Sequence, residues 1–436
     1  MADKNLANEQ YIVDESPEIA LGENTGSIQK ILSAFPAFKS RNYSLYFTGQ
    51  LISLVGTWLQ IVAEGWLVFQ LSHSAFYVGL HAAVATIPTL FLSLFGGVIV
   101  DRFPKRKILI FTQIASMILA LILGLLVILN VISVWQVIIL AFLLGVVNAI
   151  DSPARQAYVI ELVNNKKYLS SAIALNSGMF NAARVVGPTV AGLLIAGVGA
   201  GIAFLLNGLS YVAVIVALLH IRTPDKVQDK NTHPITAIKE GIKYAFASQT
   251  IKVLLMLAGV LSIFGWSYST LMPVIATNIF KISASGLGYL YACAGAGALL
   301  GSFLISAFSN KLNYWSVVIF GNILFTFSLL IFTFISNVYF AAFFLFLIGL
   351  GLVSQFSMMN TIIQHSIDDR MRGRVMAIYT MFFIGFAPIG NFEIGLVAEK
   401  FGPEFAIRLN AFILVIFGLF LFYFVKKNFR GAKAIK

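Results

Sequence analysis

Residues 312–367 read LNYWSVVIFGNILFTFSLLIFTFISNVYFAAFFLFLIGLGLVSQFSMMNTIIQHSI and contain no Asp, Glu, Lys or Arg. Residues 108–150 and 65–100 are equally free of charged side chains. A soluble domain keeps much of its surface in water, so it does not contain uncharged runs of this length. A helix that crosses the hydrocarbon core of a bilayer needs about 20 apolar residues. The sequence therefore predicts a protein with many membrane spans.

The composition agrees with this interpretation. Of the 436 residues, 59% are hydrophobic and 11% are charged, whereas a soluble domain carries about 25% charged residues. A net charge of +12 could indicate a nucleic-acid partner, but the positive residues follow the membrane topology, so we expect no nucleic acid. The single Cys293 excludes an internal disulfide and a Cys-rich metal site, and the five histidines are scattered. We expect no metal, no cofactor and no enzyme.

We predict an all-α membrane protein with twelve transmembrane helices. The predicted spans are 43–70, 76–100, 107–129, 134–153, 169–197, 201–220, 252–279, 285–308, 316–335, 338–362, 374–398 and 404–425. An even number of spans places both termini on one side of the membrane. All but four of the 30 Lys and Arg fall on that side, the exceptions being Lys281, Lys400, Arg408 and, inside a span, Arg184. This asymmetry predicts cytoplasmic termini.

The two halves of the chain resemble each other. Residues 53–56 (SLVG) match residues 262–265 (SIFG) at an offset of 209, Gly79 matches Gly288 at the same offset, and Asn207 later matches Asn410. Because each half holds six spans, the repeats are parallel, which predicts two pseudo-symmetric six-helix bundles. The expected division is 1–42 cytoplasmic tail with an interfacial segment at 27–42, 43–220 first bundle, 221–251 cytoplasmic linker, 252–425 second bundle and 426–436 cytoplasmic tail.

The loop after span two carries a recognisable motif. Residues 97–107 read GVIVDRFPKRK, which resembles the G-x-x-x-D-R-x-G-R-[KR] pattern of the major facilitator superfamily. Gly97, Asp101, Arg102 and Arg106 fit, whereas Pro104 and Lys105 stand where Gly and Arg are usual. The resemblance implies the twelve-helix major facilitator fold.

Longer strings are similar to the enterobactin-exporter-like efflux subfamily. They are residues 41–50 (RNYSLYFTGQ), 151–156 (DSPARQ) and 372–376 (RGRVM). The resemblance implies a proton-driven exporter of a siderophore or a similar small amphipathic metabolite, working by alternating access in the bacterial inner membrane, and we expect a monomer. Unlike many proton-coupled drug exporters, the chain has no Arg inside span four, 134–153. The alternatives are a multidrug efflux pump, an uptake transporter, and a non-transporting receptor or scaffold.

A polar stripe follows the first span. Gln50, Ser53, Thr57, Gln60 and Glu64 are spaced by 3, 4, 3 and 4 residues and share one helical face. We interpret Ser53, Thr57 and Gln60 as lining the substrate passage, the alternative being hydrogen bonds to a neighbouring helix. A carboxylate in the hydrocarbon region often marks an ion pathway, so we predict that Glu64 binds the coupling proton, the alternatives being a structural partner and a solvated position near the outer surface.

Arg184 is the other charge inside a span of the first half. Its planar guanidinium suits an anionic oxygen, and Asn181 shares its helical face. Arg184 either holds an anionic group of the substrate, pairs with Glu64, or makes a structural contact. Gly187 and Pro188, one turn later, and Pro388 in the second half are candidate hinges.

The second half supplies further candidates. Glu393 is a possible second proton site, the alternative being a solvated or locally bonded residue. A mixed aromatic and polar cavity is predicted from Trp266, Ser269, Gln355 and Met358, the alternative being ordinary packing.

The cytoplasmic loops predict a conformational latch. Asp101 is expected to accept hydrogen bonds from the start of span eleven, where Gly373 permits close approach. Ion pairs across the two halves are expected from Arg102, Asp151, Arg155, Asp369 and Arg370. The predicted latch consists of Gly97, Asp101, Arg102, Arg106, Asp151, Arg155, Arg370 and Gly373.

Overall fold

The computed structural model describes residues 35–163, 165–221, 234–308, 313–368 and 371–429. In the first part of the chain the elements are η1 Pro36–Lys39, α2 Arg41–Ser72, α3 Ala75–Arg102, α4 Lys105–Ile128, α5 Val134–Leu162, η2 Lys166–Tyr168, α6 Leu169–Val198 and α7 Ala200–His220. In the second part they are α8 Pro234–Ala247, α9 Gln249–Val260, η3 Leu261–Gly265, η4 Trp266–Leu271, α10 Met272–Asn278, α11 Ala284–Phe308, α12 Tyr314–Phe332, α13 Val338–His365, α14 Arg372–Thr380, η5 Met381–Gly385, α15 Ala387–Phe401 and α16 Pro403–Phe429.

Within this described part, twelve helical segments are long and apolar enough to cross a membrane, as the sequence predicts. Short polar caps start several of them. Ser74 accepts a hydrogen bond from the backbone N–H of Tyr77, and Ser133 and Gln136 form a capping box at the start of α5. These caps satisfy backbone donors that have no partner inside the helix.

Two spans are irregular in the middle. The seventh passes from α9 through a π-helical turn (η3) and a 3₁₀ turn (η4) into α10, and the eleventh passes through a π-helical turn (η5) into α15. Pro273 and Pro388 lie in the first turn of the segment that follows. Proline has no N–H to donate, so a helix restarts readily at this position. Such interruptions are frequent at functional sites.

Two sequence boundaries need correction. The span predicted to end at 153 continues to Leu162, because Pro153 is accommodated inside α5, as prolines often are in membrane helices. Of the predicted interfacial segment 27–42, residues 27–34 lie outside the described chain. The rest packs onto the bundle, since Ser40 donates its hydroxyl to the carbonyl of Leu162 at 2.6 Å and Ala37 is fully buried.

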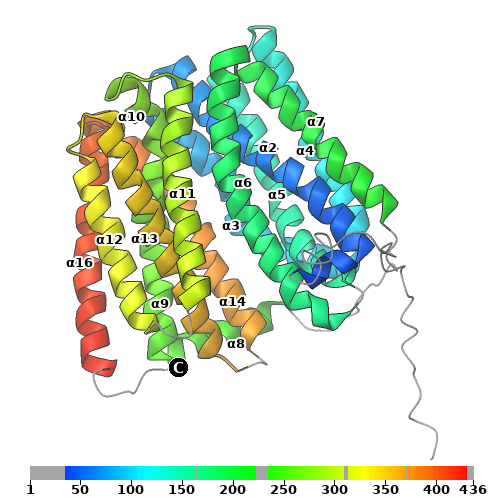
Figure 1. The fold of residues 1–436 in the computed structure, drawn as a ribbon, viewed down its shortest axis with the longest axis vertical. Helices are drawn as coiled ribbons and strands as arrows, with labels where there is room; N and C mark the ends of the chain where they lie inside the picture. The colour runs from blue at the N-terminus through cyan, green and yellow to red at the C-terminus, as the bar shows by residue number, and fades with distance from the viewer. Residues whose placement is uncertain (1–34, 164, 222–233, 309–312, 369–370, 430–436) are drawn as a thin grey trace, which may run out of the picture.

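The helices form two groups that lie side by side (Figure 1). We call α2–α7 the N-half and α9–α16 the C-half. Helix α2 begins and helix α16 ends at the lower end in this view. We call this the termini end and the opposite end the far end. Short helix α8 packs on α14 at the termini end, where Glu240 pairs with Arg374.

The halves touch closely at the far end through glycines. A methyl group on Gly79 of α3 would lie 2.6 Å from the Cα of Gly395 on α15. Likewise, a methyl group on Gly192 of α6 would lie 2.8 Å from the Cα of Gly288 on α11. Only glycine allows two backbones to approach this closely. The far end is therefore the closed end of the molecule.

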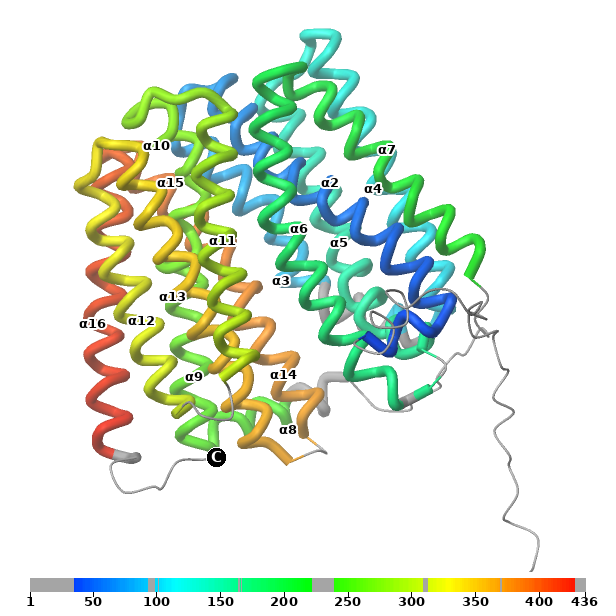
Figure 2. Tube along the Cα trace, in the orientation of Figure 1, coloured from blue at the N-terminus to red at the C-terminus, as the bar shows by residue number. Residues whose placement is uncertain are grey.

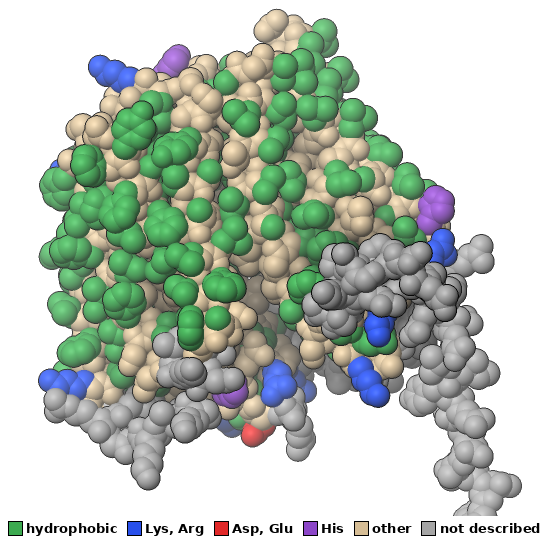
Figure 3. Space-filling model, in the orientation of Figure 1, with side chains coloured by type: hydrophobic (Ala, Val, Ile, Leu, Met, Phe, Trp, Pro, Cys, Tyr) green, Lys and Arg blue, Asp and Glu red, His purple; other side chains and the backbone are tan. Residues whose placement is uncertain are grey.

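At the termini end the halves diverge, as the tube view shows (Figure 2). A methyl group on Gly178 of α6, or on Gly373 of α14, would meet no atom of a described residue within 4 Å. The space-filling view shows hydrophobic side chains over most of this face, a recess between the halves in its lower part, and Lys and Arg gathered mainly along the termini end (Figure 3).

Candidate functional site

Arg184 lies at the junction of the two halves, near the middle of α6. Its guanidinium carbon is 4.3 Å from the ring centroid of Trp266, on η4 of the C-half, and 5.9 Å from that of Trp58, on α2 of the N-half. A cation over an aromatic face is attracted by the negative face of the ring. Arg184 therefore connects the halves through two tryptophans.

Further aromatic rings surround this contact. Phe180 packs edge-on against Trp58 with 5.5 Å between ring centroids, and Phe383 packs edge-on against Trp266 at 6.2 Å. Phe356 lies 4.3 Å from Phe383. These rings replace water around the guanidinium, and a lower local dielectric strengthens the attraction between a cation and an anion.

Arg184 has no anionic partner within the described residues. No side chain there forms an ion pair or a hydrogen bond with its guanidinium. The predicted alternative of a pair with Glu64 is wrong in this conformation, because Glu64 bonds elsewhere. An arginine presents five N–H donors in a rigid fork that matches a carboxylate or a similar anion. This cation can therefore bind an anionic ligand that reaches the junction of the halves.

Asn181 lies one turn nearer the termini end on the same helix. Its amide donates a hydrogen bond to the carbonyl of Ser177 at 2.9 Å, and its side chain is half-buried. Asn181 therefore shares the helix and the side of Arg184 without touching it through a hydrogen bond.

Glu64 is buried inside the N-half. Its Oε1 accepts a hydrogen bond from Gln60 Nε2 at 2.6 Å, and its Oε2 lies 3.1 Å from Nε2 of His81 on α3. Gln60 in turn accepts a hydrogen bond from Asn207 on α7, and Ser210 donates to Asn207 Oδ1 at 3.1 Å. The network ties three helices of one half together.

The sequence interpretation missed His81 and counted it among scattered histidines. A signal was present: Glu64 and His81 lie on either side of the short connection between the first two spans, at similar distances from it. Antiparallel neighbours place such residues at similar depth.

The polar stripe of α2 faces the inside of the N-half. Ser53 is 1% and Gln60 is 3% exposed, and Ser53 donates a hydrogen bond to Gln113 of α4 at 3.5 Å. The prediction that Ser53 and Gln60 line the passage is wrong in this conformation; the alternative of hydrogen bonds to neighbouring helices describes them. Thr57 is half-buried and donates to the carbonyl of Ser53 at 3.0 Å.

The predicted cavity residues of the C-half divide into two groups. Gln355 and Met358 are fully buried, and Gln355 accepts a hydrogen bond from Asn322 of α12 at 3.3 Å, so neither lines the passage here. Trp266 does lie at the junction, over Arg184. Ser269 follows it and donates its hydroxyl to the carbonyl of Trp266 at 2.9 Å.

Glu393 has a simpler environment than Glu64. It is half-buried on α15, and Asn410 of α16 donates to its Oε2 at 3.2 Å and to Ser267 at 3.3 Å. The alternative of a locally bonded residue describes it in this conformation.

Several predicted latch residues bond within the N-half instead of across the halves. Asp151 forms an ion pair with Arg155, one turn away on α5, with 2.7 Å between Oδ2 and Nε, and accepts a hydrogen bond from Thr112 at 2.7 Å. Arg106 donates to the carbonyls of Leu218 and Leu219 at the end of α7. These residues bond only within the N-half in these contacts. The prediction that Asp151, Arg155 and Arg106 belong to a latch between the halves is therefore wrong for this conformation.

Of the remaining latch residues, Arg102 and Gly373 make no bridge to the other half among the described residues. Arg102 is exposed, and Gly373 has no close neighbour, which contradicts the predicted close approach. The side chain of Asp101, together with Gly97 and Arg370, lies outside the described parts. The divergence of the halves at the termini end explains why a bridge is absent at Gly373.

The predicted hinges are tightly packed. A methyl group on Gly187 would lie 2.4 Å from Cβ of Trp58, and the carbonyl of Pro188 lies 3.0 Å from a methyl group built on Gly288. Gly187 and Pro188 therefore act as contact points between helices. Pro388 follows the π-helical turn η5, where the eleventh span is irregular.

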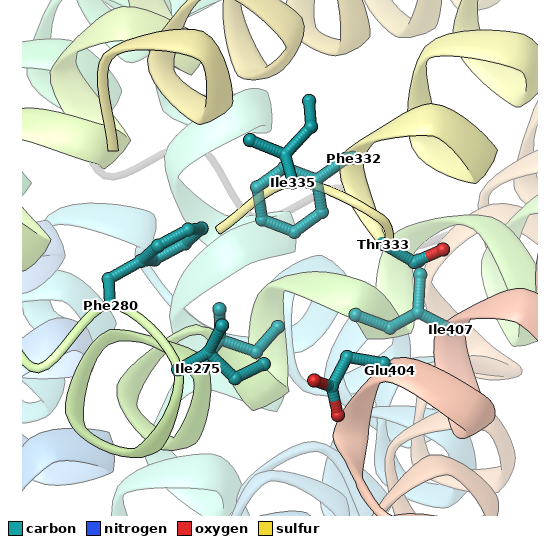
Figure 4. Close-up of a pocket in the computed structure, with 8 residues that line it drawn as sticks. Ile275, Phe280, Phe332, Thr333, Ile335, Glu404 and Ile407 are labelled. Carbon is teal, nitrogen blue, oxygen red and sulfur yellow. The ribbon is translucent and has the colours of Figure 1, made fainter. Parts of the chain in front are cut away.

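A small pocket lies at the far end of the C-half (Figure 4). Phe280, Phe332, Thr333 and Glu404 contribute to its lining. Because its whole lining comes from the C-half, it is separate from the junction at Arg184.

Two six-helix halves that meet at one end and diverge at the other have the fold of the major facilitator superfamily. Within it, the family described as transmembrane secretion effector matches residues 32–434, and the chain belongs to that family. It is a transporter and not an enzyme.

Two proteins that are similar in sequence are named for a siderophore. The chain is 25% identical over 393 residues to the staphyloferrin A transporter of Staphylococcus aureus, covering 88% of this chain and 96% of that protein. It is 24% identical over 404 residues to the enterobactin exporter of Shigella boydii, covering 90% of this chain and 92% of that protein.

Solved structures share the fold. A bacterial homologue of the human lysosomal transporter Spinster, inward-facing and unoccupied, has a TM-score of 0.71 at 15% identity over 91% of this chain and 99% of that one. A bacterial homologue of the iron transporter ferroportin, in an inward-facing state, has a TM-score of 0.67 at 14% identity over 88% and 98%.

Proposed function

We propose that this protein exports an anionic siderophore, or a similar small amphipathic anion, across the bacterial cytoplasmic membrane by proton-driven alternating access. The observation that carries the proposal is Arg184, a cation at the junction of the halves with no anionic partner among the described residues. An unpaired charge inside a membrane protein is costly, and such charges mark substrate and ion pathways. The siderophore names of two relatives support this class of cargo.

The orientation follows from charge. Lys and Arg concentrate on the side that holds both termini, so the termini end faces the cytoplasm. The diverging halves then open toward the cytoplasm, and the glycine contacts close the periplasmic side. In this state Arg184 is positioned to receive cargo from the cytoplasm, which fits export.

Protons are the proposed driving ion. Glu64 and Glu393 are carboxyl groups inside spans, and we propose that they bind the proton. A charge moved through the membrane potential releases about 2.3 kcal/mol per 100 mV. A carboxyl group that is protonated on one side and deprotonated on the other converts that energy into cargo movement.

Transport by the purified protein in liposomes tests the proposal. Staphyloferrin A and enterobactin serve as cargo probes, with a pH gradient of either sign imposed across the membrane. We expect uphill movement of an anionic siderophore against the direction of proton flow, with no movement when a protonophore collapses the gradient.

Two controls separate the alternatives. Movement of cationic dyes without siderophores would contradict the proposal and favour a multidrug pump. Movement of siderophore in the same direction as protons would indicate uptake, and no movement of any probe would favour a non-transporting protein.

A further inference from the structure

We propose that His81 and Glu64 together form a proton-binding site, and that a proton bound there favours closure of the two halves at the far end. The inference rests on the proposed function only for the choice of driving ion. It starts from the contact between the two side chains, Nε2 to Oε2 at 3.1 Å, which joins α2 to α3.

The hydrogen-bond directions in this network leave one position, between Glu64 and His81, where a proton can be gained or lost. Ser210 donates to Asn207, Asn207 to Gln60, and Gln60 to Oε1 of Glu64. An amide nitrogen only donates, so Oε1 is an acceptor. The proton that changes between states is therefore shared by Oε2 and the imidazole, and the pair is either singly negative or neutral.

The pair is shielded from water. Glu64 and His81 are each 5% exposed. A net negative charge in a membrane interior costs several kcal/mol unless a cation compensates it. Imidazole is the side chain that ordinarily changes its charge between pH 5 and 8, so the pair has a suitable proton acceptor.

No other described group compensates Glu64. Arg184 lies over two tryptophans, Arg155 pairs with Asp151, and Glu399 bonds to Ser74 and Phe76. The elements packed against α2 and α3 carry further charged and titratable groups, none of which is bonded to Glu64 or His81. These are Lys39, Asp151, Arg155, Tyr158, Glu161, Arg184, Tyr211, His220, Tyr268, Glu393, Glu399 and Lys400.

The pair lies beside the closed contact of the halves. A methyl group on Gly65, next to Glu64, would lie 3.5 Å from Cγ of Pro273 in the C-half. Gly79, two residues before His81, meets Gly395 of α15. When the halves separate here, the same turns of α2 and α3 lose their cover. We expect water that enters there to reach the pair and to solvate its negative form.

Linkage gives the direction of the effect. If closure buries the pair, closure favours the neutral, protonated form, and by reciprocity protonation favours closure. A proton arriving from the far side would thus return the empty transporter to the state open at the termini end. This is the step that an exporter needs after it has released its cargo.

The test measures the separation of the halves directly. In a Cys293→Ser background, spin labels at Val131→Cys and Ser336→Cys report the far-end distance by pulsed electron resonance, because both positions are exposed in far-end loops of different halves. We expect the population with the short distance to rise several-fold between pH 8 and pH 5.5. In His81→Gln this pH response should disappear.

His73→Asn is the matched control. His73 is an exposed histidine at the same end with φ 51°, a left-handed conformation that asparagine accepts. It should keep the full pH response. Glu64→Gln provides a second variant should His81→Gln fail to fold, and it too should lose the response.

The outcomes separate the two proposals. A pH response that persists in His81→Gln or Glu64→Gln, or is absent from the parent, would overturn the proton site. Loss of the response only in these variants supports it. A parent that responds to pH but transports no siderophore in liposomes would contradict the proposed function while leaving the proton site intact.

Discussion

The two halves use matching positions for different purposes. Asn207 on α7 and Asn410 on α16 occupy equivalent places in the repeat, and each donates a hydrogen bond into a network that includes a carboxyl group. In the N-half that network is buried and ends at the Glu64–His81 pair. In the C-half it ends at Glu393, which is half-buried and is bonded by one amide.

The difference shows that the two halves of a repeated fold can hold different functional groups. The N-half holds the buried ionisable pair and the cation Arg184, whereas the C-half supplies Trp266 and the aromatic surface that faces this cation. We infer that proton binding and anion binding depend mainly on the N-half. The C-half supplies the opposing surface against which the N-half moves.

Removal of the Arg184 guanidinium should reduce transport more than any other substitution described below. Arg184→Gln deletes the charge and the fork, and hydrogen bonds to charged groups contribute about 1.5–3 kcal/mol. We expect the initial rate of siderophore transport at low concentration to fall roughly tenfold to a hundredfold. Uptake of labelled cargo by inside-out vesicles measures it.

Arg184→Lys is the control for that experiment. It keeps the charge but loses the planar fork and the stacking on Trp266, so an intermediate rate is expected. Equal rates for the parent and Arg184→Gln would show that cargo binds elsewhere.

Asn207 and Asn410 are expected to contribute differently to the stability of the protein. Asn207→Ala removes the donor to Gln60, whose side chain is 3% exposed, and an unsatisfied buried group costs about 1–3 kcal/mol. Asn410→Ala should destabilise less, because Glu393 is half-buried and can be hydrated. Thermal unfolding in detergent measures both; a larger drop in Tm for Asn410→Ala would reverse the assignment.

Glu399 forms a polar contact between the halves at the far end, which we call the clasp. Oε2 of Glu399 on α15 accepts hydrogen bonds from Ser74 Oγ at 2.9 Å and from Phe76 N–H at 3.1 Å, at the start of α3 in the other half. A carboxylate at a helix N-terminus contributes about 0.3–1 kcal/mol. Glu399→Gln should therefore raise the far-end-open population roughly twofold to fivefold in the spin-label experiment.

Glu404→Gln is the matched control for the clasp. Glu404 lies at the same end, in the first turn of α16, and lines the pocket within the C-half. It should leave the distance distribution unchanged. An equal shift in both variants would mean that Glu399 has no special role in closure.

The smallest effect is expected at Glu393. Because this carboxyl group is half-buried and bonded within the C-half, Glu393→Gln should change the pH dependence of transport less than Glu64→Gln does. Initial rates between pH 5.5 and pH 8 compare the two variants. A flat profile in Glu393→Gln alone would move the proton site to the C-half.

The sequence predicted the large features because they depend on composition alone. Uncharged runs of sufficient length define the twelve spans, and a lone Arg184 in a span is conspicuous without any knowledge of its neighbours. The predicted end of the fourth span at residue 153 was wrong, because a membrane helix tolerates an internal proline and α5 continues to Leu162.

The contacts between helices were less predictable. Periodicity showed that Ser53, Gln60 and Glu64 share a face, but the rotation of α2 decides which neighbour that face meets. The prediction that Gln355 lines the passage failed for the same reason, since a polar residue in a span can bond to a neighbouring helix of its own half. The His81 partner required knowing how α2 and α3 are turned toward each other.

Equilibrium binding of an anionic siderophore to the purified protein tests for an anion site between the two halves. Trp58 and Trp266 flank Arg184, so their fluorescence reports occupancy of the junction. Titration of staphyloferrin A into the purified protein should change this fluorescence saturably, and Arg184→Gln should weaken binding at least tenfold. Identical affinities in the parent and in Arg184→Gln, measured in parallel by calorimetry, would contradict an anion site between the two halves.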